Sequence, residues 1–107
     1  MSPEFYKYLG PISFKKILNS IDVLNYDDSL EDIDFQFFQG IDNSSKGDLT
    51  FISNNGDLSK INLNAKAVLV SNKKIFNNLK KNNNLIIVDD VHNAVAVISN
   101  LFYRELN

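Results

Sequence analysis

The sequence predicts a single small α/β domain: a mixed β-sheet with a βαβ crossover, flanked by helices. Two continuous apolar runs, AVLV (67–70) and LIIV (85–88), are typical of strands buried on both faces of a sheet. Between them, the segment 72–81 has a helical apolar stripe, with lysines on its other side. A strand, a helix and a strand in this order predict two parallel strands joined by a right-handed crossover. A chain of 107 residues is long enough to bury one core.

The N-terminal half predicts a short helix and two short strands. Ser13 is a suitable N-cap for a helix with apolar residues at 14, 17, 18 and 21, the spacing of one buried face. A turn is expected at NYDDS (25–29). In 33–41, Ile33, Phe35 and Phe37 alternate with other residues, which predicts a strand with Gly40 at a bulge or at its end. The turn NSSKGD (43–48) then leads into a strand at LTFI (49–52).

A final helix is expected after Asp90, which is a suitable N-cap. Its apolar residues recur at helical spacing and predict one face packed on the sheet. These residues are Val91, Ala94, Val95, Ile98, Leu101 and Phe102.

Composition narrows the class of protein. The net charge of −2 gives no general attraction for nucleic acid, and no apolar segment is long enough to predict a membrane span. Without cysteine the chain has no disulfide or thiolate metal site, and a cytoplasmic location is expected.

No motif predicts catalysis, a metal ion or a cofactor in this chain. Asp89 and Asp90 resemble the acidic pair that holds magnesium in a receiver domain, but too few residues follow them for the later aspartate and lysine of such a domain. We interpret Asp90 as a helix cap, with Asp89 also favouring the positive end of the helix. His92, the single histidine, has no catalytic group paired with it by spacing and is expected at the surface. The sequence indicates a binding or structural module.

The stretch GDLTFISNN (47–55) contains the candidate binding residues. Strand alternation allows Phe51 either to fill the core or to offer its ring at the surface, where a flat aromatic face can hold a planar base. Asn54 follows three residues later, and its amide is both a donor and an acceptor for a base edge.

An ordered series of motifs resembles the N-terminal, uridine-binding domain of UDP-3-O-acylglucosamine N-acyltransferases, the third enzyme of bacterial lipid A synthesis. The series begins with the opening FYKYLGP, similar to alphaproteobacterial members, and continues with Gly47-Asp48-Leu49-Thr50-Phe51 and Asn54. It then runs through AVLVS and LIIVDD to LFY at 101–103. The match covers nearly the whole chain.

The resemblance implies that Phe51 stacks on the uracil of a UDP-acylglucosamine substrate and that Asn54 lies along the uracil edge. The family usually continues with Pro-Lys-Tyr, whose tyrosine covers the other face of the base, but here Asn55-Gly56-Asp57 follow. Losing one stacking face removes about 1–3 kcal/mol of binding free energy, so we expect weak binding, in the millimolar range or poorer. Tyr26 or Phe38 are possible replacements.

The resemblance also implies that substrate recognition and catalysis belong to different domains. In the family, a left-handed β-helix carries the catalytic histidine, receives the acyl chain from acyl-carrier protein and forms a homotrimer. His92 does not match that histidine. The 107 residues are therefore expected to recognise substrate without catalysing transfer, and to be monomeric by themselves.

Two other interpretations remain open. In one, the chain is a structural or interaction module whose nucleotide site has decayed and whose Phe51 is a core residue. In the other, it is the N-terminal domain of a Mur ligase, a uridine-nucleotide binder of similar fold. A Walker loop encoded after residue 107 would indicate the ligase, and hexapeptide repeats would indicate the acyltransferase.

Overall fold

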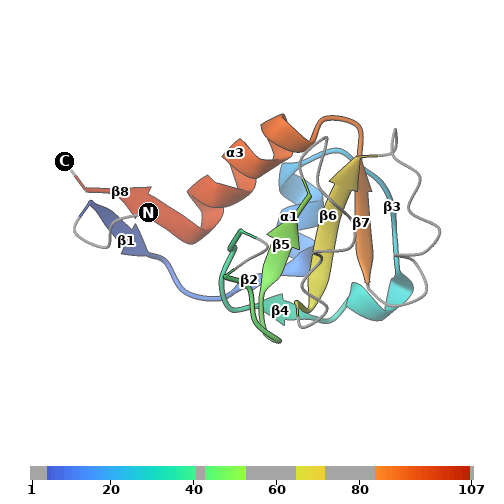
Figure 1. Cartoon of the computed structure of the whole chain (residues 1–107), viewed down its shortest axis with the longest axis horizontal. Helices are drawn as coiled ribbons and strands as arrows, with labels where there is room; N and C mark the ends of the chain where they lie inside the picture. Colours follow the sequence, from blue (N-terminus) through green and yellow to red (C-terminus); the bar gives the residue numbers. More distant parts are fainter. Residues whose placement is uncertain (1–4, 41–42, 53–64, 72–83, 107) are drawn as a thin grey trace.

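The computed structural model describes residues 5–40, 43–52, 65–71 and 84–106. Within these ranges the protein is a mixed α/β fold with a mixed sheet and two α-helices (Figure 1). The sheet has four strands in the order β3-β7-β6-β5. β5 (Leu49–Phe51), β6 (Ala67–Ser71) and β7 (Leu85–Val88) are parallel, and β3 (Val23–Tyr26) runs antiparallel to β7 at one edge. The predicted α/β class with a mixed sheet is confirmed.

The two apolar runs form the centre of the sheet. Every residue of β6 is buried, and β6 pairs with β7 in a parallel register that sets Val68 opposite Leu85. Both strands have a neighbour on each side, which explains why neither shows the alternation of a half-exposed strand. The parallel pairing that the crossover requires is present. The helix predicted at 72–81 lies outside the described residues.

Both capped helices form where the sequence predicts them. α1 (Phe14–Ser20) begins after Ser13, whose Oγ accepts a hydrogen bond from the Lys16 amide at 3.1 Å. α3 (Val91–Phe102) begins after Asp90, whose Oδ1 accepts from the Asn93 amide at 3.0 Å. These bonds satisfy amide groups that the first helical turn leaves unpaired. In the described part of the chain, no helix is both long and apolar enough to cross a membrane.

The main core lies between the helices and one face of the sheet. Leu49, Leu69 and Ile86 point from three strands to this face, where they meet the buried residues of both helices. The helices contribute Phe14, Ile17, Val91, Ala94, Ile98 and Phe102. A second, smaller cluster occupies the opposite face of the sheet and consists of Ile52, Val68, Val70 and Leu85.

The single strand predicted at 33–41 is wrong after its first residues. β4 (Asp34–Phe35) is only two residues long and pairs antiparallel with β2 (Ile12–Ser13). Farther on, Phe38 makes an isolated parallel bridge to Leu49. The segment from Asp34 to Phe38 thus pairs first with β2 and then with the start of β5. Between the two pairings, the alternation of buried and exposed side chains shifts by one residue. As a result Phe37 is 39% exposed and Phe38, expected on the opposite face from Phe35, joins it in the core at 6%.

The predicted turn at NYDDS is also only partly correct. Asn25 and Tyr26 belong to the edge strand β3, whose pairing with β7 gives them backbone partners that local sequence does not reveal. The turn begins at Asp27, which caps a short 3₁₀-helix, η1 (Asp28–Leu30), by accepting from the Ser29 amide at 3.0 Å.

A two-stranded ribbon that the sequence did not predict joins the two ends of the chain. β1 (Tyr6–Tyr8) pairs antiparallel with β8 (Tyr103–Glu105), which follows α3 directly. The ribbon projects away from the sheet, toward the left of the view (Figure 1). At its base, the Leu9 amide donates to the Phe102 carbonyl at 2.8 Å and ties the ribbon to the end of α3.

Thr50 places a polar hydroxyl in the buried interior of the sheet. It is fully buried in β5 opposite Val68, and its Oγ1 has no hydrogen-bond partner within the described ranges. A buried unpaired hydroxyl costs about 1–3 kcal/mol, whereas valine has the same shape without it. We expect Thr50→Val to raise the free energy of unfolding by about 1 kcal/mol and the melting temperature by about 4–8 °C. Thr50→Ser, which keeps the hydroxyl, should give no such gain, and a Thr50→Val protein that melts lower would contradict the interpretation.

Candidate functional site

The turn before β5 holds the candidate strand in place. Asp48 is 3% exposed, and its Oδ2 accepts hydrogen bonds from the Ser45 amide at 2.9 Å and the Ser45 hydroxyl at 3.1 Å. A side chain at Gly47 would place its Cβ 3.0 Å from the Gln36 side chain, which is too close without a shift. The Gly-Asp pair of the motif therefore has a structural role, because it closes the turn from which β5 starts.

Phe51 lies at the carboxyl end of β5, the edge of the sheet where all three parallel strands end. It is partly buried and packs against the main core, and its ring centroid is 5.3 Å from that of Phe38 at 43°. Ligands of open α/β sheets bind outside the carboxyl ends of the strands, so the position suits a binding residue. The other candidate, Asn54, lies outside the described residues, as do Asn55-Gly56-Asp57.

Neither residue suggested as a second stacking ring is placed to sandwich a base with Phe51. Tyr26 lies on β3, with β7 and β6 between it and β5, and its ring packs on Phe14 at 4.9 Å. Phe38 is a direct neighbour of Phe51, but the two rings touch, so no planar base fits between them. Phe38 supports the Phe51 ring from one side, and a base on Phe51 would stack on a single face.

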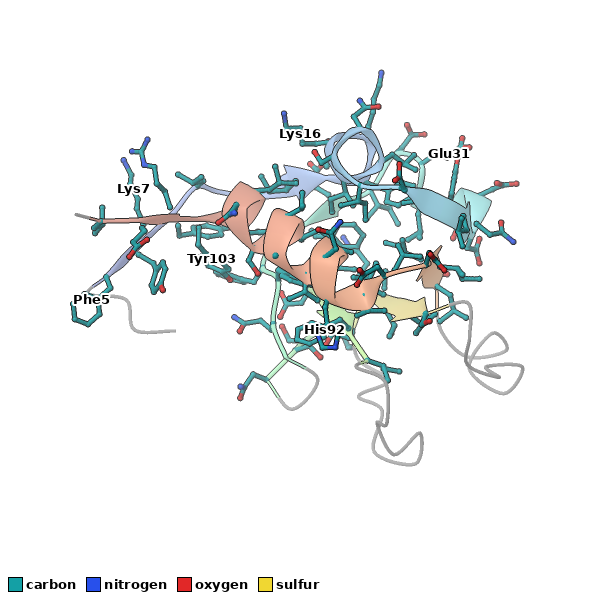
Figure 2. All side chains as sticks on the ribbon, turned by 90° about the horizontal axis from the view of Figure 1, so that it is seen from above. Phe5, Lys7, Lys16, Glu31, His92 and Tyr103 are labelled. Atoms are coloured by element: carbon teal, nitrogen blue, oxygen red, sulfur yellow. The ribbon has the colours of Figure 1, made fainter. Side chains whose placement is uncertain are left out.

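The acidic residues after β7 have a structural explanation. Asp90 caps α3 as predicted, and Asp89 is exposed beside it. A small cavity of about 130 Å³ adjoins them and is also lined by Asp22 and Asn93. His92 is exposed in the first turn of α3, as expected, and Tyr103 lies at the other end of that helix (Figure 2). In the described part of the molecule, no group of acidic or histidine residues can hold a metal ion.

A cavity lies between the ribbon and the segment that flanks β5. Its volume is about 410 Å³. Aromatic rings and side-chain amides dominate its walls, and we call it the aromatic pocket. It is lined by Tyr6, Tyr8, Phe37, Phe38, Gln39, Asn43 and Tyr103. Phe38 separates the pocket from Phe51, because its ring contacts Phe51 and also lines the pocket.

Two tyrosine hydroxyls fasten the ribbon to this segment. The Tyr8 hydroxyl donates to the Gln36 carbonyl, and the Tyr103 hydroxyl donates to the Phe38 carbonyl at 3.3 Å. Burial raises the pKa of Tyr8, and the negative charge of Asp48 adds to this. Burial likewise raises the pKa of Tyr103, although the bond to Phe38 opposes it. Both hydroxyls are therefore neutral donors at physiological pH.

Sequence reasoning missed the aromatic pocket because its residues come from distant parts of the chain. One signal was available: Tyr6 and Tyr8 are two residues apart, so a strand there places both rings on one face. Tyr103 lies opposite Tyr8 in the ribbon and adds its ring to that face. In comparisons with known proteins, the chain matches no family model and no curated sequence.

Proposed function

We propose that the chain is the uridine-nucleotide recognition domain of a UDP-3-O-acylglucosamine N-acyltransferase, with a fold similar to the Mur ligase N-terminal domain. The observation that carries the proposal is the place of Phe51. Phe51 stands at the carboxyl end of a parallel strand, and the residue is only partly buried, which is compatible with contact to a ligand. The ordered series of motifs along the chain supports the same assignment.

In this proposal Phe51 is the stacking residue and Asn54 pairs with the uracil edge. Phe38 contacts the Phe51 ring, and we assign the base to a part of the ring that Phe38 does not cover. One stacking face is worth about 1–3 kcal/mol, so the domain binds uridine nucleotides weakly. Acyl transfer from acyl-carrier protein and assembly into a trimer belong to a β-helix domain outside these 107 residues.

Titration with UDP-N-acetylglucosamine, followed by two-dimensional amide NMR, tests the assignment. We expect the Thr50, Phe51 and Ile52 signals to shift at millimolar nucleotide, because a stacked base changes the ring-current field at the end of β5. Phe51→Ala should abolish these shifts, since the stacking face is removed.

Phe5→Ala is the matched control, because Phe5 is 59% exposed at the outer end of the ribbon (Figure 2). This variant should retain the nucleotide shifts unchanged. Two results would refute the assignment of Phe51. One is the absence of any shift at about 10 mM ligand, about tenfold above a dissociation constant of about 1 mM. The other is a set of shifts that persists in Phe51→Ala.

A second candidate function is a structural or interaction module, and the contact between Phe51 and the core favours it. In that case Phe51→Ala lowers the free energy of unfolding and nucleotide has no effect on the melting temperature. A fully buried phenylalanine loses about 3–5 kcal/mol on truncation, and a partly buried one loses less. Melting curves of both proteins with and without nucleotide separate the two functions, because a ligand that binds only the folded state raises the melting temperature.

A further inference from the structure

The aromatic pocket combines two walls from different parts of the fold. The ribbon contributes Tyr6, Tyr8 and Tyr103, and the segment beside β5 contributes the rest. Backbone hydrogen bonds fix that segment on β5: the Gln39 amide donates to the Leu49 carbonyl at 3.0 Å. Since the tyrosine hydroxyls attach the ribbon to the same segment, both walls of the pocket are held in place.

The walls provide flat apolar surface that remains accessible. The rings of Tyr8 and Phe37 pack together at 4.8 Å and 30°, yet these residues are still 37% and 39% exposed. Such exposed faces favour another ring, because aromatic groups gain from offset stacking beyond the burial of their area. An aliphatic ligand would gain the burial alone.

The polar groups that the described residues contribute to the pocket are uncharged. Gln39 and Asn43 each have a side-chain amide that both donates and accepts, and no side-chain hydrogen bond occupies these amides within the described structure. The hydroxyls of Tyr8 and Tyr103 already donate hydrogen bonds to backbone carbonyls, so toward a ligand they can act only as acceptors. No charged side chain is among the described lining residues, so a charged ligand would lose water without gaining a partner of opposite charge among them.

We propose that the aromatic pocket is a binding site for a neutral, planar ring whose edge carries both a hydrogen-bond donor and an acceptor. The ring stacks on the exposed aromatic faces, and its edge pairs with the amides of Gln39 and Asn43. Asp48, which is close enough to raise the pKa of Tyr8, makes the pocket unfavourable for anions. This site is separate from the one proposed for uracil, because Phe51 is not among its lining residues.

Benzamide is a suitable probe, because it is a neutral flat ring with one amide. We expect it to shift the amide NMR signals of Tyr8, Gln39 and Asn43 in a saturable way. Cyclohexanecarboxamide carries the same amide without a flat face and should bind at least about fivefold more weakly, since stacking is lost. Benzoate keeps the ring but is charged, and it should also bind more weakly. Equal binding of all three compounds would overturn the proposal, as would the absence of saturable shifts with benzamide.

Variants then test the polar edge. Gln39→Ala and Asn43→Ala should each weaken benzamide binding by about threefold to tenfold, as expected for one hydrogen bond. Asn100→Ala removes an exposed amide on α3 and is the matched control, which should bind like the unmodified protein. Spectra of each variant without ligand report whether the fold is intact, so a loss of binding with unchanged spectra supports the proposal. Unchanged binding in both pocket variants would refute the role of the amides.

The proposals for the two sites can be refuted independently of each other. Nucleotide binding at Phe51 is measured at Thr50 to Ile52, whereas benzamide is measured at Tyr8, Gln39 and Asn43. Phe51→Ala should leave benzamide binding in place, and Gln39→Ala should leave the nucleotide shifts in place. If nucleotide shifts the pocket signals instead of Thr50 to Ile52, the assignment of Phe51 is wrong, and so is the expectation that the pocket disfavours anions.

Discussion

Phe102→Ala is expected to lower the free energy of unfolding by about 3–5 kcal/mol, a large part of the total stability of a domain of this size. The side chain is fully buried at the last residue of α3. Its ring lies 6.2 Å from that of Phe38 and 6.1 Å from that of Tyr103, so it joins the core to the base of the ribbon. Truncation leaves a cavity. We expect this cavity to close only in part, because Phe102 lies at the junction of α3 and β8.

Urea denaturation followed by circular dichroism measures this loss. Leu106→Ala is the control, since Leu106 is an apolar residue that is 48% exposed, and its replacement should change stability by no more than about 0.5 kcal/mol. The stability measurement is made without nucleotide or benzamide. Benzamide binding should be lost wherever the Phe102→Ala protein is partly unfolded. A loss below about 1 kcal/mol would show that Phe102 does not join the two parts of the fold.

Asp48→Ala is expected to cost about 2–3 kcal/mol of unfolding free energy, because it removes a carboxyl acceptor that is almost completely buried. The Ser45 amide and hydroxyl both donate to this carboxylate, and alanine leaves the amide without a partner. The loss should open the turn before β5, because the side-chain bonds to Ser45 close it. The backbone carbonyl of residue 48, which accepts from the Lys66 amide at 2.8 Å beside β6, is retained in alanine. The same denaturation experiment measures the loss of stability.

Two variants make this test specific. Asp48→Asn retains one oxygen that can accept from Ser45, so its loss should be smaller than that of Asp48→Ala. Asp32→Ala removes an exposed carboxylate of the same kind and should have little effect. If Asp48→Ala and Asp32→Ala are equally stable, the carboxylate does not hold the turn.

The elements that formed as predicted depend on neighbours in sequence. α1 and α3 combine a cap with an apolar stripe, and both signals lie within one helix length. β6 and β7 are uninterrupted apolar runs, which have no solvent-compatible face and so must occupy the centre of a sheet. The Gly-Asp turn is local too, and it fixes where β5 begins.

The candidate site was predictable only in part. The sequence pointed to Phe51, but whether its ring filled the core or faced a ligand depended on which residues of distant segments packed beside it. Phe38 and Tyr26 show the same limit: both are aromatic residues within the first 40 positions, yet one touches Phe51 and the other lies across the sheet.

By itself, the sequence determined the α/β class, the two capped helices, the buried parallel strands and the turn before β5, because cap bonds and apolar periodicity act between residues close in the chain. Tertiary structure alone decided the β1–β8 ribbon, the shifted alternation at Phe37 and Phe38, and the aromatic pocket. Each of these depends on pairing between segments far apart in sequence, and a strand with few residues gains its backbone partners only when the fold brings a second segment beside it.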